Sequence, residues 1–204
     1  MYERFGKRGL DLLAAAAALL LLAPVMAAVA LLVLWRLGRP VMFVQLRAGR
    51  GGRPFRMFKF RSMAEGDAPD AARLDGFGRR LRASGLDELP QLVNVLRGEM
   101  SLVGPRPLPL SYLHHYSARQ AQRLRVRPGI LGPGVAAGRN AVPWAARLEL
   151  GAEYAGRPPT LARDIGLALR SLLVWATGRG GSAPGHATMP AFRGGEGEEG
   201  GPSR

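Results

Sequence analysis

The chain has no cysteine, three histidines, and only two lysines among its 29 basic residues. The absence of cysteine excludes disulfides and thiolate metal sites, and it agrees with a cytoplasmic setting. His114, His115 and His186 lack the spacing of a metal site. The sequence also contains no P-loop, no GxGxxG and no Ser/His/Asp arrangement. Any chemistry must therefore come from carboxylates and arginines.

Acidic and aromatic residues are scarce as well. Fifteen acidic residues face 29 basic ones, which gives 204 residues a net charge of +14. Such a surface suits nucleic acid, anionic lipid or a phosphorylated substrate. Aromatic residues are sparse outside residues 55–60, whereas binding of single-stranded nucleic acid favours aromatics interleaved with basic residues. The length predicts one compact domain plus an appendage.

Only one long apolar run is present, the 24 uncharged residues 12–35. As a helix it would measure roughly 36 Å, enough to cross a bilayer core. A signal peptide is disfavoured, because the run is too long for an h-region and leads into Leu34-Trp35-Arg36 rather than a cleavage site.

Cationic residues flank this run on both sides, with Lys7 and Arg8 before it and Arg36 and Arg39 after it. A spanning helix normally has a cationic bias on one side only. Pro24 lies mid-run and should bend or break the helix. Two interpretations stay open: a kinked single span, and a re-entrant helix broken at Pro24 that returns through the same leaflet.

The remaining chain predicts an α+β fold that is mostly helical. Residues 41–45 and 55–61, separated by glycines and a proline, predict a β-hairpin. We expect a loop or weak helix at 64–75, and helices at 77–82, 110–125 and 161–177. The last of these has the bulk to pack or to lie on a membrane. The Gly- and Pro-rich end is expected to be disordered over its last ten residues.

Asp87 and Glu88 are an adjacent acidic pair in this basic chain. Pro90 is tolerated only in the first turn of a helix, so we expect a helix from Asp87 to just before Gly98. In the ordinary interpretation the pair caps that helix, which is worth roughly 1 kcal/mol. In the functional interpretation one carboxylate is a nucleophile and its neighbour helps to hold Mg²⁺. The helix N-terminus would also favour a substrate phosphate.

Arg106 stands between two prolines, and its stiff backbone suits two-pronged binding of a phosphate. Further candidates for phosphate binding are Lys59, Arg61, Arg82 and Arg139. Taken singly, each could equally be a solvated surface charge.

Residues 87–91 (DELPQ) and 104–107 (GPRP) resemble the signature of the bacterial sugar transferases, the monotopic phosphoglycosyl transferases. Other segments are similar to family motifs in the same order: Lys7-Arg8 with Asp11, Pro24, and residues 59–63, 127–130 and 138–140. The tail segment 185–192 resembles the small subfamily that includes the diacetylbacillosamine-1-phosphate transferases.

The resemblance implies transfer of a sugar 1-phosphate from a UDP-sugar to undecaprenyl phosphate, with release of UMP. Asp87 would be the nucleophile that forms a phosphosugar–aspartyl intermediate, and Glu88 would assist Mg²⁺. The resemblance also implies phosphate contacts from Lys59, Arg61, Arg82, Arg106 and Arg139, and membrane or polyprenol-phosphate contacts from Lys7, Arg8 and Pro24. The expected sugar is N-acetylated.

The implied organisation has three parts. Residues 1–38 form a re-entrant membrane helix, residues 39–178 a helical catalytic domain with a small hairpin, and residues 179–204 a tail. The protein would sit in one leaflet at the cytoplasmic face of the bacterial inner membrane, with no nucleic acid bound. Downstream glycosyltransferases are candidate partners.

The chain departs from the family pattern at Leu131, Pro133, Ala137 and Gly151, away from the acidic pair. These departures bear on sugar recognition more than on reaction class. Two alternatives remain: a membrane-anchored basic protein that binds nucleic acid, and an inactive homologue that acts as a scaffold. The first does not explain the acidic pair, and the intact pair argues against the second.

Overall fold

The computed structural model describes residues 2, 6–181, 183, 186 and 188–194. The expected disorder of residues 195–204 lies outside this part of the chain. The fold is α+β and mostly helical, as the sequence predicts. Its helices and strands, in chain order, are α1 (Lys7–Leu37), β1 (Met42–Ala48), β2 (Pro54–Phe60), α2 (Asp70–Arg73), α3 (Gly76–Ser84), α4 (Gln91–Leu96), β3 (Ser101–Val103), α5 (Ala118–Ala121), β4 (Gly129–Leu131), α6 (Pro133–Ala136), α7 (Trp144–Gly156) and α8 (Leu161–Ala176).

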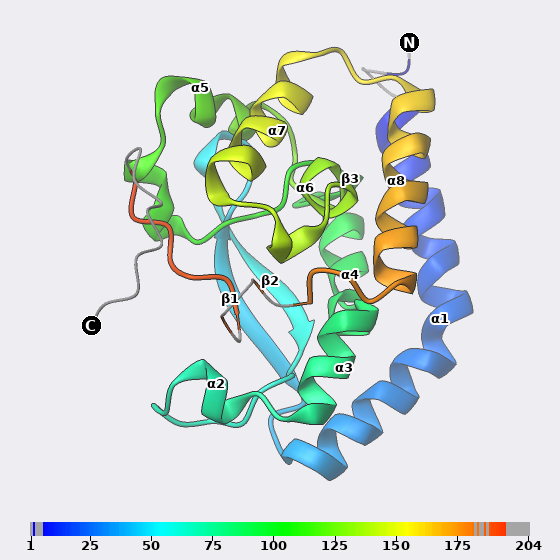
Figure 1. Cartoon of the computed structure of the whole chain (residues 1–204). Helices are drawn as coiled ribbons and strands as arrows, with labels where there is room; N and C mark the ends of the chain where they lie inside the picture. Colours follow the sequence, from blue (N-terminus) through cyan, green and yellow to red (C-terminus); the bar gives the residue numbers. More distant parts are fainter. Residues whose placement is uncertain (1, 3–5, 182, 184–185, 187, 195–204) are drawn as a thin grey trace.

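Helix α1 contains the apolar run, and it alone among the described helices is long and apolar enough to cross a membrane. The expected break at Pro24 does not occur, because the α-helix continues through the proline. A proline removes one backbone donor and crowds the preceding turn, which bends a helix without ending it. The bend about midway along α1 is visible in Figure 1. Side chains such as Leu13, Leu20 and Trp35 are largely exposed on this helix.

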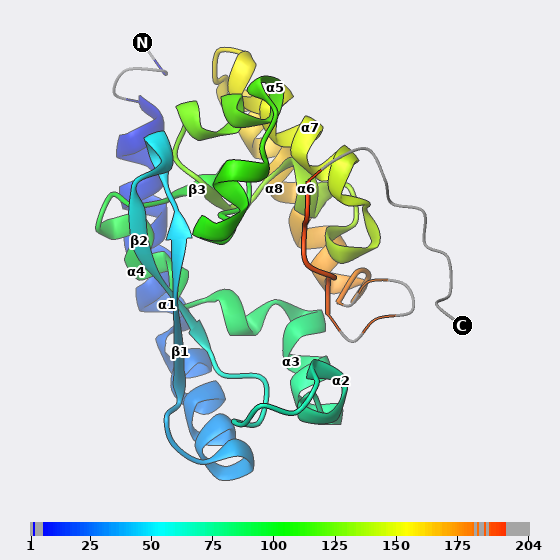
Figure 2. The ribbon, with the colours of Figure 1, turned by 90° about the vertical axis from the view of Figure 1, so that its left-hand side faces the viewer.

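The predicted hairpin is confirmed. Strands β1 and β2 pair antiparallel, from Met42 opposite Phe60 to Ala48 opposite Pro54. Gly51 and Gly52 in the connection have φ of 68° and 74°, a conformation that favours glycine. Figure 2 shows the hairpin running alongside α1, with α7 on the other side of the molecule.

The acidic pair precedes its helix instead of lying in it. A 3-10 turn covers Leu86–Glu88, and α4 begins only at Gln91, after Pro90. The expectation of one helix from Asp87 was therefore wrong at its start. Its end was right, since Gly98 follows α4 with φ of 84°, the conformation of a glycine that ends a helix.

The expected single helix at 110–125 was also wrong. The segment divides into a 3-10 helix (Leu110–His115), the short α5, and a second 3-10 turn (Gln122–Arg125). The physical reason is a new helix start at Ser117, whose hydroxyl and backbone form a reciprocal capping box with Gln120. The helices predicted near 77–82 and 161–177 are confirmed as α3 and α8.

The body packs along α1 over most of the helix. One apolar cluster joins α1, β2 and α4, with Ala15, Met57 and Val95 at its centre. A second joins the C-terminal half of α1 to β2 and α3 through Val33, Phe60 and Leu81. Burial of this apolar surface fixes the hairpin and α4 against α1.

Candidate functional site

A sharp turn presents the acidic pair. Gly85 ends α3 with φ of 73°, and a Cβ on it would lie 2.6 Å from the Trp175 ring. A side chain is thus excluded here by both conformation and space. The turn that follows buries both acids, leaving Asp87 5% exposed and Glu88 1% exposed.

Glu88 is held by four donors. Arg106 donates to both carboxylate oxygens, at 2.8 and 3.1 Å. Lys59 Nζ donates to Oε1 at 3.2 Å, and Gln91 donates to Oε2 at 3.3 Å. Burial raises the pKa of Glu88, but the charges of Arg106 and Lys59 outweigh it and hold the pKa well below its usual range. Glu88 is therefore ionised and fully hydrogen-bonded.

Asp87 has the opposite environment. Its Oδ1 is buried and has no hydrogen-bond partner among the described residues. Burial raises the pKa of Asp87, Lys59 opposes the rise, and Glu88 adds to it. A buried carboxylate oxygen without a partner is costly unless a ligand or ion completes it. Asp87 is thus the open member of the pair.

A cavity of about 830 Å³ opens beside the pair. It is lined by all five candidates for phosphate binding, Lys59, Arg61, Arg82, Arg106 and Arg139. The structure therefore brings together residues from the hairpin, α3 and two later loops. A concave, strongly cationic site of this size fits a phosphorylated ligand.

Two of these arginines also support the backbone around the cavity. Arg61 binds the carbonyl oxygens of Leu37 and Gly38 at the C-terminal end of α1. Near the end of α3, the Arg139 guanidinium donates to the carbonyl oxygen of Arg82 at 2.6 Å and to that of Ala83 at 3.0 Å. Arg139 itself has φ of 58°, the only described non-glycine residue with positive φ. Strain of this kind is tolerated where the surroundings impose it, commonly at functional sites.

Arg82 is oriented by a side chain that follows β2. Its Nε donates to Ser62 Oγ at 2.8 Å. Burial lowers the pKa of Arg82, and Asp87 is the largest charge that opposes this fall. Arg82 is thus a cation near the open carboxylate.

Sequence reasoning missed several residues of the cavity wall. Arg47, Arg73 and Arg147 line it, as do Tyr112 and Trp144. No local motif marks them, because they come from β1, α2, α7 and the 110–115 turn, which only the tertiary fold brings together.

The C-terminal tail also contributes to the wall, through Thr188 and Met189. Thr188 donates to Asp70 at 2.7 Å, and Trp144 Nε1 donates to the Pro190 carbonyl at 2.8 Å. After α8 the chain turns back across the molecule toward the hairpin (Figure 1). The described part of the tail is therefore packed onto the catalytic part.

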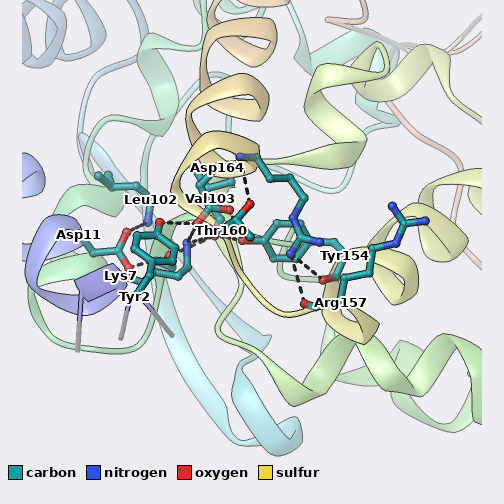
Figure 3. Close-up of polar contacts among 11 residues, drawn as sticks. Tyr2, Lys7, Asp11, Leu102, Val103, Tyr154, Arg157, Thr160 and Asp164 are labelled. Atoms are coloured by element: carbon teal, nitrogen blue, oxygen red, sulfur yellow. Dashed lines mark hydrogen bonds and ion pairs between the residues drawn. The ribbon is translucent and has the colours of Figure 1, made fainter. Parts of the chain in front are cut away.

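Lys7, Arg8 and Pro24 do not line this cavity. Lys7 donates to Asp164 at 2.6 Å and to the Val103 carbonyl at 3.1 Å (Figure 3). Arg8 donates to the carbonyl of Val95 at 2.8 Å, near the C-terminal end of α4. Both cations thus join the start of α1 to the body. Their expected contact with polyprenol phosphate stays a prediction.

The residues beside the cavity include few that could bind a hard cation. No group of three or more His, Cys, Asp or Glu side chains that could hold a metal occurs among the described residues. Mg²⁺, however, is often held by one or two carboxylates together with substrate phosphates and water. The Asp87 carboxylate, which lines the cavity, fits that role, whereas both oxygens of Glu88 already have two donors each.

Comparisons with known proteins identify the family. The family described as bacterial sugar transferase matches residues 2–178. The chain belongs to this family. It is 46% identical over 137 residues to the UDP-glucose:undecaprenyl-phosphate glucose-1-phosphate transferase of Caulobacter vibrioides, covering 62% of this chain and 51% of the relative.

Two further relatives differ in length. The UDP-N-acetylgalactosamine-undecaprenyl-phosphate N-acetylgalactosaminephosphotransferase of Aeromonas hydrophila is 42% identical over 139 residues, covering 63% of this chain and 33% of the relative. The exopolysaccharide production protein ExoY of Sinorhizobium fredii is 34% identical over 197 residues, covering 85% and 87%. The chain thus spans about half of the Caulobacter relative, about a third of the Aeromonas relative and most of the Sinorhizobium relative.

None of the family departures Leu131, Pro133, Ala137 and Gly151 lines the cavity. At Gly151 a Cβ would lie 3.4 Å from Pro105 and 3.5 Å from Arg123, which is ordinary van der Waals contact. The first atom of a side chain would therefore fit between α7 and the loop that carries Arg106.

Proposed function

We propose that this protein transfers a sugar 1-phosphate from a UDP-sugar to undecaprenyl phosphate and releases UMP. The observation that carries the proposal is the contrast within the acidic pair. Asp87 lines the cationic cavity and its buried Oδ1 has no hydrogen-bond partner among the described residues, whereas Glu88 is saturated by Arg106 and Lys59. The names of relatives describe the same type of reaction.

In the first step Asp87 attacks the phosphorus that bears the sugar. A bond forms between the carboxylate oxygen and phosphorus, the bond from phosphorus to the UMP oxygen breaks, and UMP leaves with the electron pair. Lys59 and Arg82 are placed to offset the negative charge of the phosphoryl group. In the second step an oxygen of undecaprenyl phosphate attacks the same phosphorus and frees Asp87.

Mg²⁺ would bind at one carboxylate oxygen of Asp87 together with the substrate diphosphate, and the other oxygen would be the attacking atom. When bound, it would neutralise phosphate charge and so lower the barrier to attack. Glu88 serves this arrangement indirectly in the proposal, because its four hydrogen bonds fix Lys59 and Arg106 beside Asp87.

Two observations support a re-entrant α1 at the cytoplasmic face of the inner membrane. The start of α1 is bound to the body by Lys7 and by Asp11, which accepts from Ser101 Oγ at 2.7 Å (Figure 3). The end of α1 is bound to the same body by Arg61. A helix that crossed the bilayer would put these two ends on opposite sides, and the packed hairpin and α4 would have to enter the hydrocarbon.

The proposed sugar carries an N-acetyl group. Support comes from the tail, which resembles that of the subfamily using acetamido sugars and places Thr188 and Met189 in the cavity wall. A site built to pair an acetamido group discriminates strongly, since a hydroxyl sugar leaves polar atoms unpaired. A preference for UDP-galactose would reject this part alone.

The test uses purified protein, undecaprenyl phosphate and a panel of UDP-sugars, with and without Mg²⁺. Wild type should release UMP only when Mg²⁺ is present. Asp87→Asn keeps the size of the side chain but removes the attacking charge, so turnover should fall about 10³-fold or more. Mass spectrometry of wild type quenched without acceptor should find the phosphosugar on the Asp87 peptide. Near-normal turnover by Asp87→Asn would reject the covalent route.

A further inference from the structure

Two arginines in the cavity wall have no acidic partner among the described residues. Arg147 on α7 is 7% exposed, and its only side-chain hydrogen bond among the described residues is a long one of 3.5 Å to Asn140. Arg47 on β1 donates to Gln45 at 2.5 Å, while its Nε is buried and unpartnered. Neither forms an ion pair with a described residue.

Four other cations of the wall differ in this respect. Lys59 and Arg106 pair with Glu88, Arg61 with Glu65, and Arg73 with Asp70. Arg82 and Arg139 form no ion pair with a described residue, but Arg82 donates to Ser62 Oγ and Arg139 donates to two backbone carbonyls. Arg47 and Arg147 therefore carry positive charge that no carboxylate among the described residues pairs with. A buried charge without a partner is costly, which is why such groups commonly await a ligand.

Arg106 connects the two. Burial lowers the pKa of Arg47 to about 10 and that of Arg147 to about 9, and in both cases Arg106 is the charged neighbour that adds most to the fall. Both arginines remain cationic at neutral pH. Arg47 on β1, Arg106 on the loop after β3 and Arg147 on α7 all line this cavity, and of the three only Arg106 pairs with a described carboxylate.

We propose that Arg47 and Arg147 form a subsite for the phosphate of the departing nucleoside monophosphate. This proposal rests on the proposed function. Arg47 and Arg147 line the same cavity as Asp87, the proposed nucleophile. The nucleophile and the leaving oxygen lie roughly in line in phosphoryl transfer, so the leaving phosphate needs cations other than those beside the attacked group. In the proposal the guanidiniums of Arg47 and Arg147 offset the charge that grows as the phosphorus–oxygen bond breaks.

The Arg147 guanidinium is held in place by Trp144, whose ring centre lies 4.7 Å from its Cζ. Such stacking orients the planar fork and leaves its edge available to an anion. Lysine at this position would keep the charge but lose the fork. The subsite therefore needs the shape of arginine as well as its charge.

The experiment titrates UMP and uridine into wild type, Arg147→Gln, Arg147→Lys and Arg47→Gln. Each glutamine variant should weaken UMP binding about tenfold or more, which is about 1.4 kcal/mol, and should leave uridine binding unchanged. Arg147→Lys should lie between wild type and Arg147→Gln. Arg80→Gln is the matched control, since it removes the same charge from an exposed position on α3.

Kinetics separate the leaving phosphate from the acceptor phosphate. The variants should raise KM for the UDP-sugar and leave KM for undecaprenyl phosphate unchanged; a change in the acceptor KM alone would overturn the proposal. So would equal losses of UMP and uridine binding, or no loss of UMP binding in folded Arg47→Gln. If wild type releases no UMP from any UDP-sugar, the proposed function fails, and the UMP titration still tests the subsite independently.

Discussion

At the scale of residues, Asp87 and Glu88 show how neighbours in sequence acquire different properties. Both are buried, so desolvation raises the pKa of each carboxyl. Glu88 faces Arg106 and Lys59 directly, and their charges reverse the effect. Asp87 has no direct donor on Oδ1, so burial prevails. One carboxylate thus organises cations while the other stays open.

Removing the charge of Glu88 should destabilise the fold. Glu88→Gln leaves Arg106 and Lys59 facing each other without their shared anion, and breaking a buried pair costs about 3–5 kcal/mol. Because the Arg106 side chain is 28% exposed, we expect about 2–4 kcal/mol. Urea unfolding measures it. Glu149→Gln, which removes an exposed ion pair with Arg119, is the control and should change little. Equal stability of the two variants would contradict the assignment.

Deprotonation of Lys59 should make kcat/KM fall on the basic side of its pH profile. Burial lowers the pKa of its ammonium to about 8, although Glu88 opposes the fall. The side chain is charged below this value and neutral above it, so kcat/KM should decline as the pH rises through about 8. In Lys59→Arg the guanidinium stays charged, and this fall should move upward by about one pH unit or more. If the basic fall in kcat/KM occurs at the same pH in Lys59→Arg as in wild type, another group causes it.

At the scale of elements, the position of β2 depends on one side chain of α4. Asn94 is fully buried; its Oδ1 accepts from the Phe58 backbone at 3.1 Å, and its Nδ2 donates to the Arg56 carbonyl at 2.7 Å. These bonds satisfy strand groups that would otherwise be orphaned inside the molecule. They also fix Lys59, the next residue on the strand, relative to Glu88.

Asn94→Leu should therefore lower both the free energy of unfolding and the rate of UMP release. The substitution keeps the volume but leaves a buried N–H and a buried C=O unpaired, at about 1–3 kcal/mol for each group. Thermal or urea unfolding measures the loss, and the UMP-release assay measures the effect on Lys59. A loss of stability below about 0.5 kcal/mol would show that water or another group replaces the amide.

At the scale of the whole molecule, α1 is attached at both ends and along its length to one body. The buried Asp164 accepts from Lys7 and also from Tyr154, at 2.7 Å (Figure 3). Lys7 and Asp11 thereby connect the start of α1 to β3, α7 and α8. In the proposed membrane arrangement the exposed apolar side chains of the helix contact lipid.

This attachment predicts the same sidedness for both ends. The chain lacks cysteine, so Gly6→Cys and Arg39→Cys each introduce one label site. An impermeant thiol reagent should leave both sites unlabelled in intact cells and should label both after the membrane is opened. Labelling of the Gly6→Cys site alone in intact cells would mean that α1 crosses the bilayer.

Sequence alone determined the features that depend on neighbours along the chain. The apolar run, the hairpin with its glycine turn, α3 and α8 follow from periodicity and local conformational preference. The ordered motifs were sufficient to indicate the family. The five residues predicted to bind phosphate line one cavity, and their binding of phosphate stays a prediction. These signals are local, because hydrophobic pattern and turn chemistry act over a few residues.

Tertiary structure decided what depends on packing between distant segments. It kept α1 continuous through Pro24, divided residues 110–125 at the Ser117 cap, and placed Asp87 in a turn before α4. It brought Arg47 and Arg147 to one cavity from strands and helices about a hundred residues apart. A side chain's burial and charge environment are set by such long-range neighbours, and for that reason no local pattern distinguishes Asp87 from Glu88 or Arg147 from a surface arginine.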